Sequence, residues 1–430
     1  MLKVGEGADE LFFVAEPTVV FHIITQTQIK DINDLKSQLI SKTTNIPEMR
    51  SKIVKIFNSH YLKMFNLEDF TRLLNSAISE IAEDFQNEQD LCNFIATKVN
   101  KIIPKDTLQY RILVKQDFNK NQSAVVFVFH HGICDGVGFL NFLGAIQDQF
   151  DIKALPYVRE RTLKDQISRY LKIPTGVFYQ KQSQSAKIQR SQLFQQSNNN
   201  LTEYVISNDY KLDELKALSR AFNSSINELL IAASIIANQK LANIYGFDDF
   251  NIYDVLIAIN QRSPLTKLSD FTMLNQSLCY NLIVKLKHQD LFQENNITQV
   301  LPKILTIFQS ELQRVKEDDR ELALQYYGKF FTWFMPDSII PIIAKNFNNS
   351  LKRTWSNLNG SSKPIKIAGS YSEKIFFSSF LREEEYYIAN VLSHNGWIRL
   401  AIIGRNQNFK FLDFIQQFNL VMEELMNGKK

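Results

Sequence analysis

The clearest feature of the chain is an apolar run that passes, through a short polar turn, into a helical pattern. Residues Ala124–Phe129 read AVVFVF without a polar interruption, which is typical of a strand buried on both faces. Helical spacing then relates four apolar residues, Val137, Leu140, Leu143 and Ile146. We therefore expect a central strand, a tight turn that its glycines allow, and an amphipathic helix.

Further strands and helices are predicted on both sides of this unit. Continuous or alternating apolar runs predict strands at Thr18–Thr25, Tyr110–Val114, Val255–Ile259 and Leu278–Leu286. Apolar stripes predict helices that begin near Ile32, Leu91 and Leu212, and a further one that Ser224 or Ser225 would cap.

The length of the chain favours two domains. At 430 residues it exceeds what one ordinary hydrophobic core organises, so two units of about 200 residues are expected. Between Gln180 and Asn200 the sequence is rich in Gln, Ser and Asn, which predicts a surface crossover. The expected organisation is an N-terminal domain at 1–178, a polar linker at 179–202 and a C-terminal domain at 203–430.

Composition narrows the class of protein. With 45% hydrophobic and 22% charged residues, the chain is typical of globular proteins. A net charge of +4, evenly spread, gives no reason to expect nucleic acid as a partner. The 33 phenylalanines favour large apolar interiors or a surface that meets lipid.

Cysteine usage and the N-terminal sequence bear on location. Cys92, Cys134 and Cys279 are few and widely spaced, which favours a reducing, intracellular compartment over a disulfide framework and gives no metal motif. The acidic N-terminal stretch argues against a secretory or mitochondrial leader, and no apolar run reaches the roughly 18 residues of a spanning helix. We expect no metal or redox cofactor.

The polar turn after the central strand carries the candidate chemistry. It reads H-H-x-x-x-D-G, with His130, His131, Asp135 and Gly136 at the fixed positions. An imidazole there can act as a general base, because neutral histidine takes and returns a proton near physiological pH. Both histidines would otherwise be satisfied turn residues. Cys134 offers a rival mechanism as a nucleophile that a histidine activates, although a small buried cysteine is the more ordinary interpretation.

This turn resembles the signature of the coenzyme A-dependent acyltransferases with the chloramphenicol acetyltransferase fold, a superfamily that includes peptide-synthetase condensation domains. Within it the chain is most similar to the wax ester synthase/diacylglycerol acyltransferase family. The second half supports this with Asn227, with Arg262 after a strand, with Asn275 before a strand, and with the pair Ser356 and Asn357. The chain departs from the family pattern where Leu274 stands for a glycine, His394 for a tyrosine, and a proline-leucine-tryptophan element has no tryptophan.

The resemblance implies an α/β (α+β) fold of two chloramphenicol acetyltransferase-like domains, each a mixed sheet flanked by helices, with the active-site tunnel between them. It implies His131 as the general base, with His130 and Gly136 beside it, and Asp135 in an ion pair that holds the turn. Arg50 and Arg262 are the candidate partners, and we favour Arg50. Asn227, Asn275, Ser356 and Asn357 are the substrate or oxyanion candidates; each would otherwise cap or hold a loop.

The activity implied by the resemblance is transfer of a fatty acyl group from acyl-coenzyme A, as co-substrate, to a long-chain alcohol or a diacylglycerol. Two alternatives stay open: a transferase that uses a carrier-bound acyl group or another acceptor, and a catalytically idle subunit of a larger assembly. The expected location is the cytoplasm, or the periphery of the endoplasmic reticulum or a lipid droplet, as a monomer or homodimer. The aromatic and apolar segment Tyr326–Ile343 would lie on such a lipid surface, although such stripes are more often core.

Overall fold

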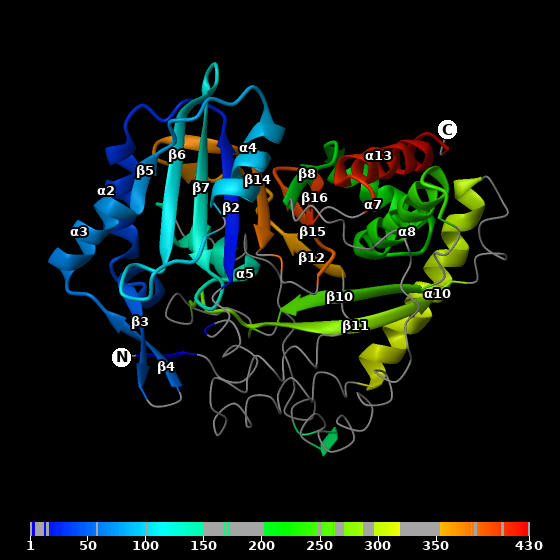
Figure 1. Cartoon of the computed structure of the whole chain (residues 1–430), viewed down its shortest axis with the longest axis horizontal. Helices are drawn as coiled ribbons and strands as arrows, with labels where there is room; N and C mark the ends of the chain where they lie inside the picture. Colours follow the sequence, from blue (N-terminus) through cyan, green and yellow to red (C-terminus); the bar gives the residue numbers. More distant parts are fainter. Residues whose placement is uncertain are drawn as a thin grey trace.

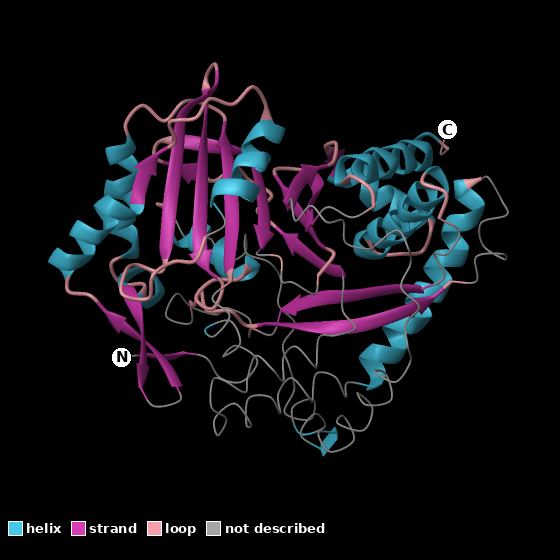
Figure 2. Cartoon of the chain, viewed as in Figure 1, coloured by secondary structure: helices cyan, strands magenta, loops and turns pink. Residues whose placement is uncertain are grey.

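The computed structural model describes residues 2–4, 13, 17–56, 59–99, 101–148, 167, 171–172, 202–247, 252–260, 262, 271–286, 296–318, 353–379, 381, 385–405 and 408–428. Two mixed sheets organise the fold, and helices flank them (Figures 1 and 2). The expected α/β class is therefore confirmed. The predicted linker at 179–202, apart from Thr202, and the segment Tyr326–Ile343 lie outside the described residues.

The first sheet has the strand order β13-β14-β2-β7-β6-β5. The predicted central strand is β7, and it runs antiparallel to both of its neighbours, β2 and β6. The strands are β2 (Thr18–Thr25), β5 (Ile78–Glu80), β6 (Tyr110–Asn119), β7 (Gln122–His130), β13 (Lys366–Ile367) and β14 (Ser370–Ser379).

β7 is apolar from Ala124 to Phe129, where both of its faces are covered. Val125, Phe127 and Phe129 point into one hydrophobic cluster, together with residues of the helices on that side. Alternate residues from Ala124 to Val128 point into another cluster on the opposite face. The helices and the helical turn on this half are α2 (Ile32–Thr43), η1 (Pro47–Arg50), α3 (Leu67–Ala77), α4 (Glu88–Phe94), η2 (Ile95–Val99) and α5 (Gly136–Ala145).

A small sheet of β1, β4 and β3 adjoins the first half. Its strands are β1 (Leu2–Val4), β3 (Ser51–Ile56) and β4 (Ser59–Met64), all paired antiparallel. β3 follows η1 directly, so this sheet fixes the position of the short Pro47–Arg50 turn.

The second sheet has the order β11-β10-β12-β15-β16-β8, with β9 also paired to β16. Its strands are β8 (Thr202–Ile206), β9 (Tyr210–Lys211), β10 (Ile252–Asn260), β11 (Ser277–Lys285), β12 (Arg353–Asn359), β15 (Tyr387–His394) and β16 (Trp397–Arg405). The helices of this half are α7 (Leu212–Ala221), α8 (Ile226–Ile244), α10 (Ile297–Asp318) and α13 (Phe411–Asn427).

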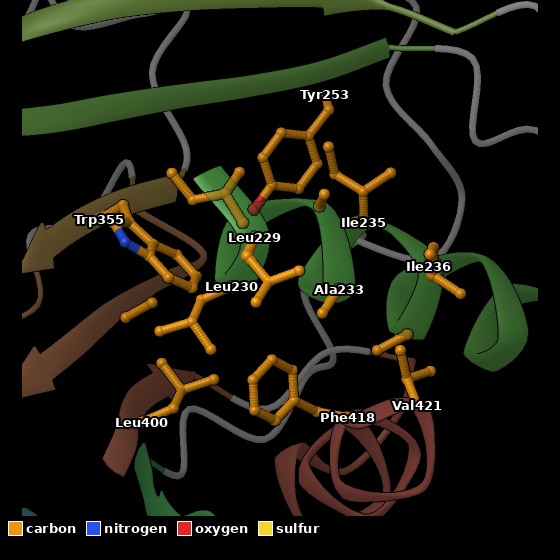
Figure 3. Close-up of a cluster of buried hydrophobic side chains, with 14 of the residues drawn as sticks. Leu229, Leu230, Ala233, Ile235, Ile236, Tyr253, Trp355, Leu400, Phe418 and Val421 are labelled. Carbon is orange, nitrogen blue, oxygen red and sulfur yellow. The ribbon is translucent and has the colours of Figure 1, made fainter. Parts of the chain in front are cut away.

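One face of the second sheet packs against these helices around Trp355, Tyr253 and Phe418 (Figure 3). The other face is turned to the first sheet. Ile388 and Ala401 of the second sheet share a hydrophobic cluster with Val20 and Val126 of the first. The two halves therefore meet through a common apolar layer.

A strand from the C-terminal half completes the first sheet. β14, at residues 370–379, pairs antiparallel with β2, and in Figure 1 it lies in orange beside the blue β2. The C-terminal half also supplies Leu358 and Met273 to the hydrophobic cluster around α5. A simple division of the chain at residue 203 did not predict this exchange.

Candidate active site

The histidine turn leaves β7 at the end where β2 begins. His130 is the last residue of β7 and lies opposite Thr18. The backbone N–H of His130 donates to the carbonyl of Gln109 at 2.9 Å, and that of His131 donates to the carbonyl of Pro17 at 2.8 Å. Neighbouring strands thus fix the backbone of both histidines.

His130 is a buried, neutral member of the turn. Its Nδ1 accepts a hydrogen bond from the backbone N–H of Gly132 at 3.1 Å, so the proton of the neutral ring is on Nε2. The ring stacks on Phe13 with a centroid distance of 5.3 Å. Burial, and next the charge of His131, lower the pKa of His130 to about 3. The ring therefore stays uncharged at physiological pH.

His131 differs from His130 because it keeps partial exposure. His130 is fully buried, whereas His131 is intermediate in exposure. A general base must come within hydrogen-bond distance of the proton that it takes. Of the two imidazoles, that of His131 meets this requirement better.

Asp135 joins the two halves of the protein. Its carboxylate caps α5 by accepting the N–H of Gly138 at 2.8 Å, and it faces the guanidinium of Arg262 with both N–O distances at 2.8 Å. It also accepts the backbone N–H of Gln276 at 2.9 Å. Only 3% of Asp135 and 4% of Arg262 are exposed, so this is a buried, hydrogen-bonded ion pair.

The preference for Arg50 as the partner of Asp135 is wrong. The Nε of Arg50 donates to the carbonyl of Phe65 at 2.7 Å, and its Nη1 donates to that of Thr44 at 3.3 Å. Arg50 thereby ties η1 to the start of α3. The sequence alone could not show which arginine pairs with Asp135, because the pairing depends on how the second half of the protein docks on the first.

Two glycines let the second half approach the helix that follows the turn. A Cβ on Gly136 would lie 2.3 Å from Cδ1 of Leu358 on β12. A Cβ on Gly138 would lie 2.1 Å from the backbone carbonyl oxygen of Met273. Any side chain at Gly138 would therefore push apart two backbones, which cannot yield as a side chain can.

The segment 271–276 from the second half is held against the histidine turn by charged side chains. Glu48 of η1 accepts the hydroxyl of Thr272 at 2.7 Å and the N–H of Met273 at 2.9 Å. Arg262 donates to the carbonyl of Leu274. Sequence reasoning missed Glu48; the signal was an acidic residue between Pro47 and Met49 in a short proline turn, where a buried carboxylate requires donors.

Asn275 is the best placed of the oxyanion candidates. Its backbone N–H lies 3.4 Å from the carbonyl of Gly132, which is the residue after His131. Its Oδ1 accepts from the N–H and hydroxyl of Ser277. Its Nδ2 is buried and has no hydrogen-bond partner in the described part of the chain. A donor so placed can stabilise a developing negative charge.

The other candidates divide between the two faces of β12. Ser356 is on the same side of this strand as Leu358, which contacts Gly136, because side chains alternate along a strand. Asn357 points the other way, with Trp355. Asn227 has a structural role: its Oδ1 accepts the indole N–H of Trp355 at 2.8 Å. The structure thus brings Asn275 against the turn and places Ser356 on the face of β12 that packs on the start of α5, whereas Asn227 bonds Trp355.

Cys134 is buried within the turn and does not have the character of a nucleophile. It is fully buried, and its Sγ lies 3.5 Å from the carbonyl of Asp135. Burial, and next the negative charge of Asp135, raise the pKa of its thiol well above the usual value. The thiol therefore stays protonated, and the histidine mechanism is favoured.

A metal cluster and a membrane-spanning helix are both absent from the described ranges. Across these ranges, no group of three or more His, Cys, Asp or Glu side chains is arranged to hold a metal ion. No helix in the part of the chain that the structure describes has the length and apolar character to cross a membrane.

Comparison with known proteins supports the resemblance. Residues 298–425 match the family model of the WS/DGAT C-terminal domain. No curated protein sequence matches the chain. The wax ester synthase/diacylglycerol acyltransferase from Marinobacter aquaeolei VT8 is similar in structure with a TM-score of 0.64 and 13% identity, and the match covers 99% of both chains.

Two other solved structures share the fold. The trichothecene 15-O-acetyltransferase from Fusarium sporotrichioides has a TM-score of 0.68 at 12% identity, with 98% of this chain and 94% of that chain covered. The first condensation domain of the calcium-dependent antibiotic synthetase has a TM-score of 0.65 at 9% identity, with 99% and 96% covered. Residues 298–425 are thus similar to the C-terminal domain of the WS/DGAT family, and the chain shares its fold with a wax ester synthase/diacylglycerol acyltransferase, an O-acetyltransferase and a condensation domain.

Proposed function

We propose that this protein transfers a fatty acyl group from acyl-coenzyme A to the hydroxyl of a long-chain alcohol or a diacylglycerol. The observation that carries the proposal is the Asp135–Arg262 ion pair, which holds an intact H-H-x-x-x-D-G turn between the two halves. The pair keeps the turn that presents His131 in place, as an active transferase requires.

The reaction follows from the residue types. His131 accepts the proton of the acceptor hydroxyl while its oxygen attacks the thioester carbonyl carbon. The Nδ2 of Asn275 donates to the oxyanion that develops there. The tetrahedral intermediate then collapses, the carbon–sulfur bond breaks, and His131 returns its proton to the departing sulfur. The products are an ester and free coenzyme A.

His130 and Asp135 act by positioning in this scheme. The neutral ring of His130 accepts from Gly132 and keeps the turn compact. Asp135 caps α5 and holds Arg262, so its carboxylate takes no proton during turnover. Catalysis then rests on placement of the reactants and on a single proton carrier.

The alternative donor is a thioester on a carrier protein. The fold that the chain shares with a condensation domain supports this alternative. Because the acceptor is apolar, the proposed place of action is a lipid surface. The proposal also includes a reducing compartment, and the reaction as written uses no metal or redox cofactor.

The test is release of free coenzyme A thiol from palmitoyl-coenzyme A with hexadecanol, with a diacylglycerol, or with no acceptor. We expect acceptor-dependent release, and we expect His131→Ala to abolish it because the proton then has no carrier. His394→Gln is the matched control: His394 bonds Ser372 at 2.9 Å, and Ser372 pairs with Thr25 at the opposite end of β2 from Thr18 and His130.

Absence of release with every acceptor, from protein with a normal melting curve, would refute coenzyme A-dependent transfer. A parallel assay with a palmitoylated acyl carrier protein then decides between the carrier-dependent enzyme and the idle subunit.

A further inference from the structure

Asn390 is a buried side chain in the middle of β15. It is 1% exposed, and neither its Nδ2 nor its Oδ1 has a hydrogen-bond partner in the part of the chain described here. Burying an amide without partners is destabilising, since it loses its hydrogen bonds to water. Such a side chain at a strand centre requires an explanation other than stability.

The side chain points from the second sheet toward the first half. Its neighbours Ala389 and Val391 belong to the core beneath the helices. Ile388 and Leu392, two residues away on either side, belong to clusters that include residues of the first sheet. Because side chains alternate along a strand, Asn390 shares the face of Ile388 and Leu392.

The neighbouring strand places Asn390 beside a candidate site residue. In the parallel pairing of β12 with β15, Asn390 lies opposite Ser356, and Leu392 lies opposite Leu358. Leu358 is the residue that Gly136 approaches at the start of α5. Ser356 and Asn390 therefore form a polar pair across the two strands. This pair lies next to the pair Leu358 and Leu392, of which Leu358 packs on the start of α5.

The direction of the chain puts this polar pair on the side of the histidines. Beyond Leu358 the chain runs toward Lys366, whose backbone N–H donates to Oε1 of Gln147, two residues past the C-terminal end of α5. Leu358 lies at the N-terminal end of that helix. The polar pair precedes Leu358 on β12, so it lies beyond the start of α5, where the turn is.

Other buried asparagines of this half show what a structural role looks like. The Oδ1 of Asn227 accepts from Trp355 at 2.8 Å, and the Nδ2 of Asn238 donates to the carbonyl of Ser234 at 2.8 Å. Asn390 makes no such bond within the described ranges. An unbonded donor and an unbonded acceptor on one side chain match a secondary amide, which offers one N–H and one C=O.

We infer that Asn390 binds a secondary amide of the pantetheine arm of the acyl donor, with Ser356 beside it. The inference rests on the proposed function, because it identifies how that site holds its thioester. The pantetheine arm carries two secondary amides, and both coenzyme A and a carrier protein present the same arm.

The test compares three unreactive thioethers by calorimetry on the full chain: S-octyl-coenzyme A, S-octylpantetheine and octyl 2-hydroxyethyl sulfide, which has no amide. Asn390→Leu is expected to weaken binding of both amide-bearing compounds about tenfold, equal to about 1.4 kcal/mol, and to change that of the third less than about twofold. Much tighter binding of the coenzyme A compound than of the pantetheine compound by the wild type would identify free coenzyme A as the source; equal affinities would favour a carrier.

Stability separates this role from a structural one. Since the side chain has no partner to lose, Asn390→Leu should keep or raise the melting temperature. Asn390→Val, which cannot overfill the site, repeats the binding test should the leucine variant fold poorly. Asn238→Leu is the control: it removes a buried asparagine in α8 and should leave all three affinities unchanged.

Unchanged affinity of both Asn390 variants for S-octyl-coenzyme A and S-octylpantetheine would overturn the inference, as would failure of the wild type to bind either. These results are independent of turnover. Failure of the proposed function shows instead as absent thiol release by the wild type.

Discussion

Arg262 faces Asp135 from 127 residues further along the chain and presents two guanidinium nitrogens to its two carboxylate oxygens. The pair crosses from one half of the protein to the other and fixes the turn that carries His131. Its burial means that neither partner regains full hydration when the other is removed.

Removing the arginine should therefore be costly. Arg262→Met leaves Asp135 buried and short of its main partner, and we expect a loss of about 3–5 kcal/mol in the free energy of unfolding, measured by urea denaturation. Transferase activity should fall with it, because the segment 271–276 loses its contact with Arg262.

Arg50→Met is the control for that measurement. Arg50 bonds only backbone carbonyls of its own half in the described contacts, so we expect a loss near 1 kcal/mol. Equal losses in the two variants would contradict the assignment of Arg262 as the partner.

Gly138→Ala should disrupt the contact between α5 and the second half. The added methyl would lie 2.1 Å from the carbonyl oxygen of Met273, and neither can move away, because the backbone of residue 138 fixes the methyl and the oxygen is itself backbone. We expect a fall in melting temperature together with loss of most activity. Gly428→Ala is the matched control, since its Cβ would stay 3.2 Å from the nearest atom, the carbonyl oxygen of Glu424. A stable, active Gly138→Ala protein would show that this contact is dispensable.

Cys134→Ala should keep its activity. The thiol is fully buried and its pKa is raised, so it is a packing group, and its removal costs about 1–2 kcal/mol of stability through a small cavity. Turnover within about twofold of the wild type, measured below the melting temperature, is the expected result. Complete loss of turnover in a folded variant would restore the cysteine nucleophile.

Acid should destabilise the protein before its carboxylates titrate. The pKa is lowered to about 3 for His22 and His130 and to about 4 for His394, in each case mainly by burial. Below the unfolded value of about 6.5 the unfolded chain binds more protons than the folded one, so stability falls as pH falls.

Each histidine contributes about 1.4 kcal/mol between pH 7.5 and 5.5, so the three together give roughly 4 kcal/mol. Urea midpoints at the two pH values measure this, and His394→Gln should reduce the difference by about a third. A midpoint that does not move between these pH values would mean that the three histidines take up protons in the folded state as well.

The sequence predicted local structure well where one pattern dominated. β2 begins at Thr18 and ends at Thr25 as predicted, because its apolar run is bounded on both sides by polar residues. Ser225, one of two candidates, caps α8 and completes a capping box with Glu228. The central strand, turn and helix also follow the expected order.

Features that depend on how the halves dock were harder to predict. The choice between Arg50 and Arg262, the role of Glu48 and the orphaned amide of Asn390 all concern residues far apart in the chain. The same holds for β14, whose sequence reads as an ordinary strand and contains no sign of the sheet that it joins. Periodicity reports which face of an element is apolar but not which surface covers that face.

The position of β14 has a consequence for biosynthesis. Every residue of β2 is buried, and β14 covers the edge of β2 that β7 leaves open. While the ribosome is still making the second half, this edge presents unpaired backbone groups on a strongly apolar strand, a surface prone to aggregation. The N-terminal half can complete its sheet only after residue 379 has emerged, so a truncated product that stops earlier would need a chaperone to stay soluble.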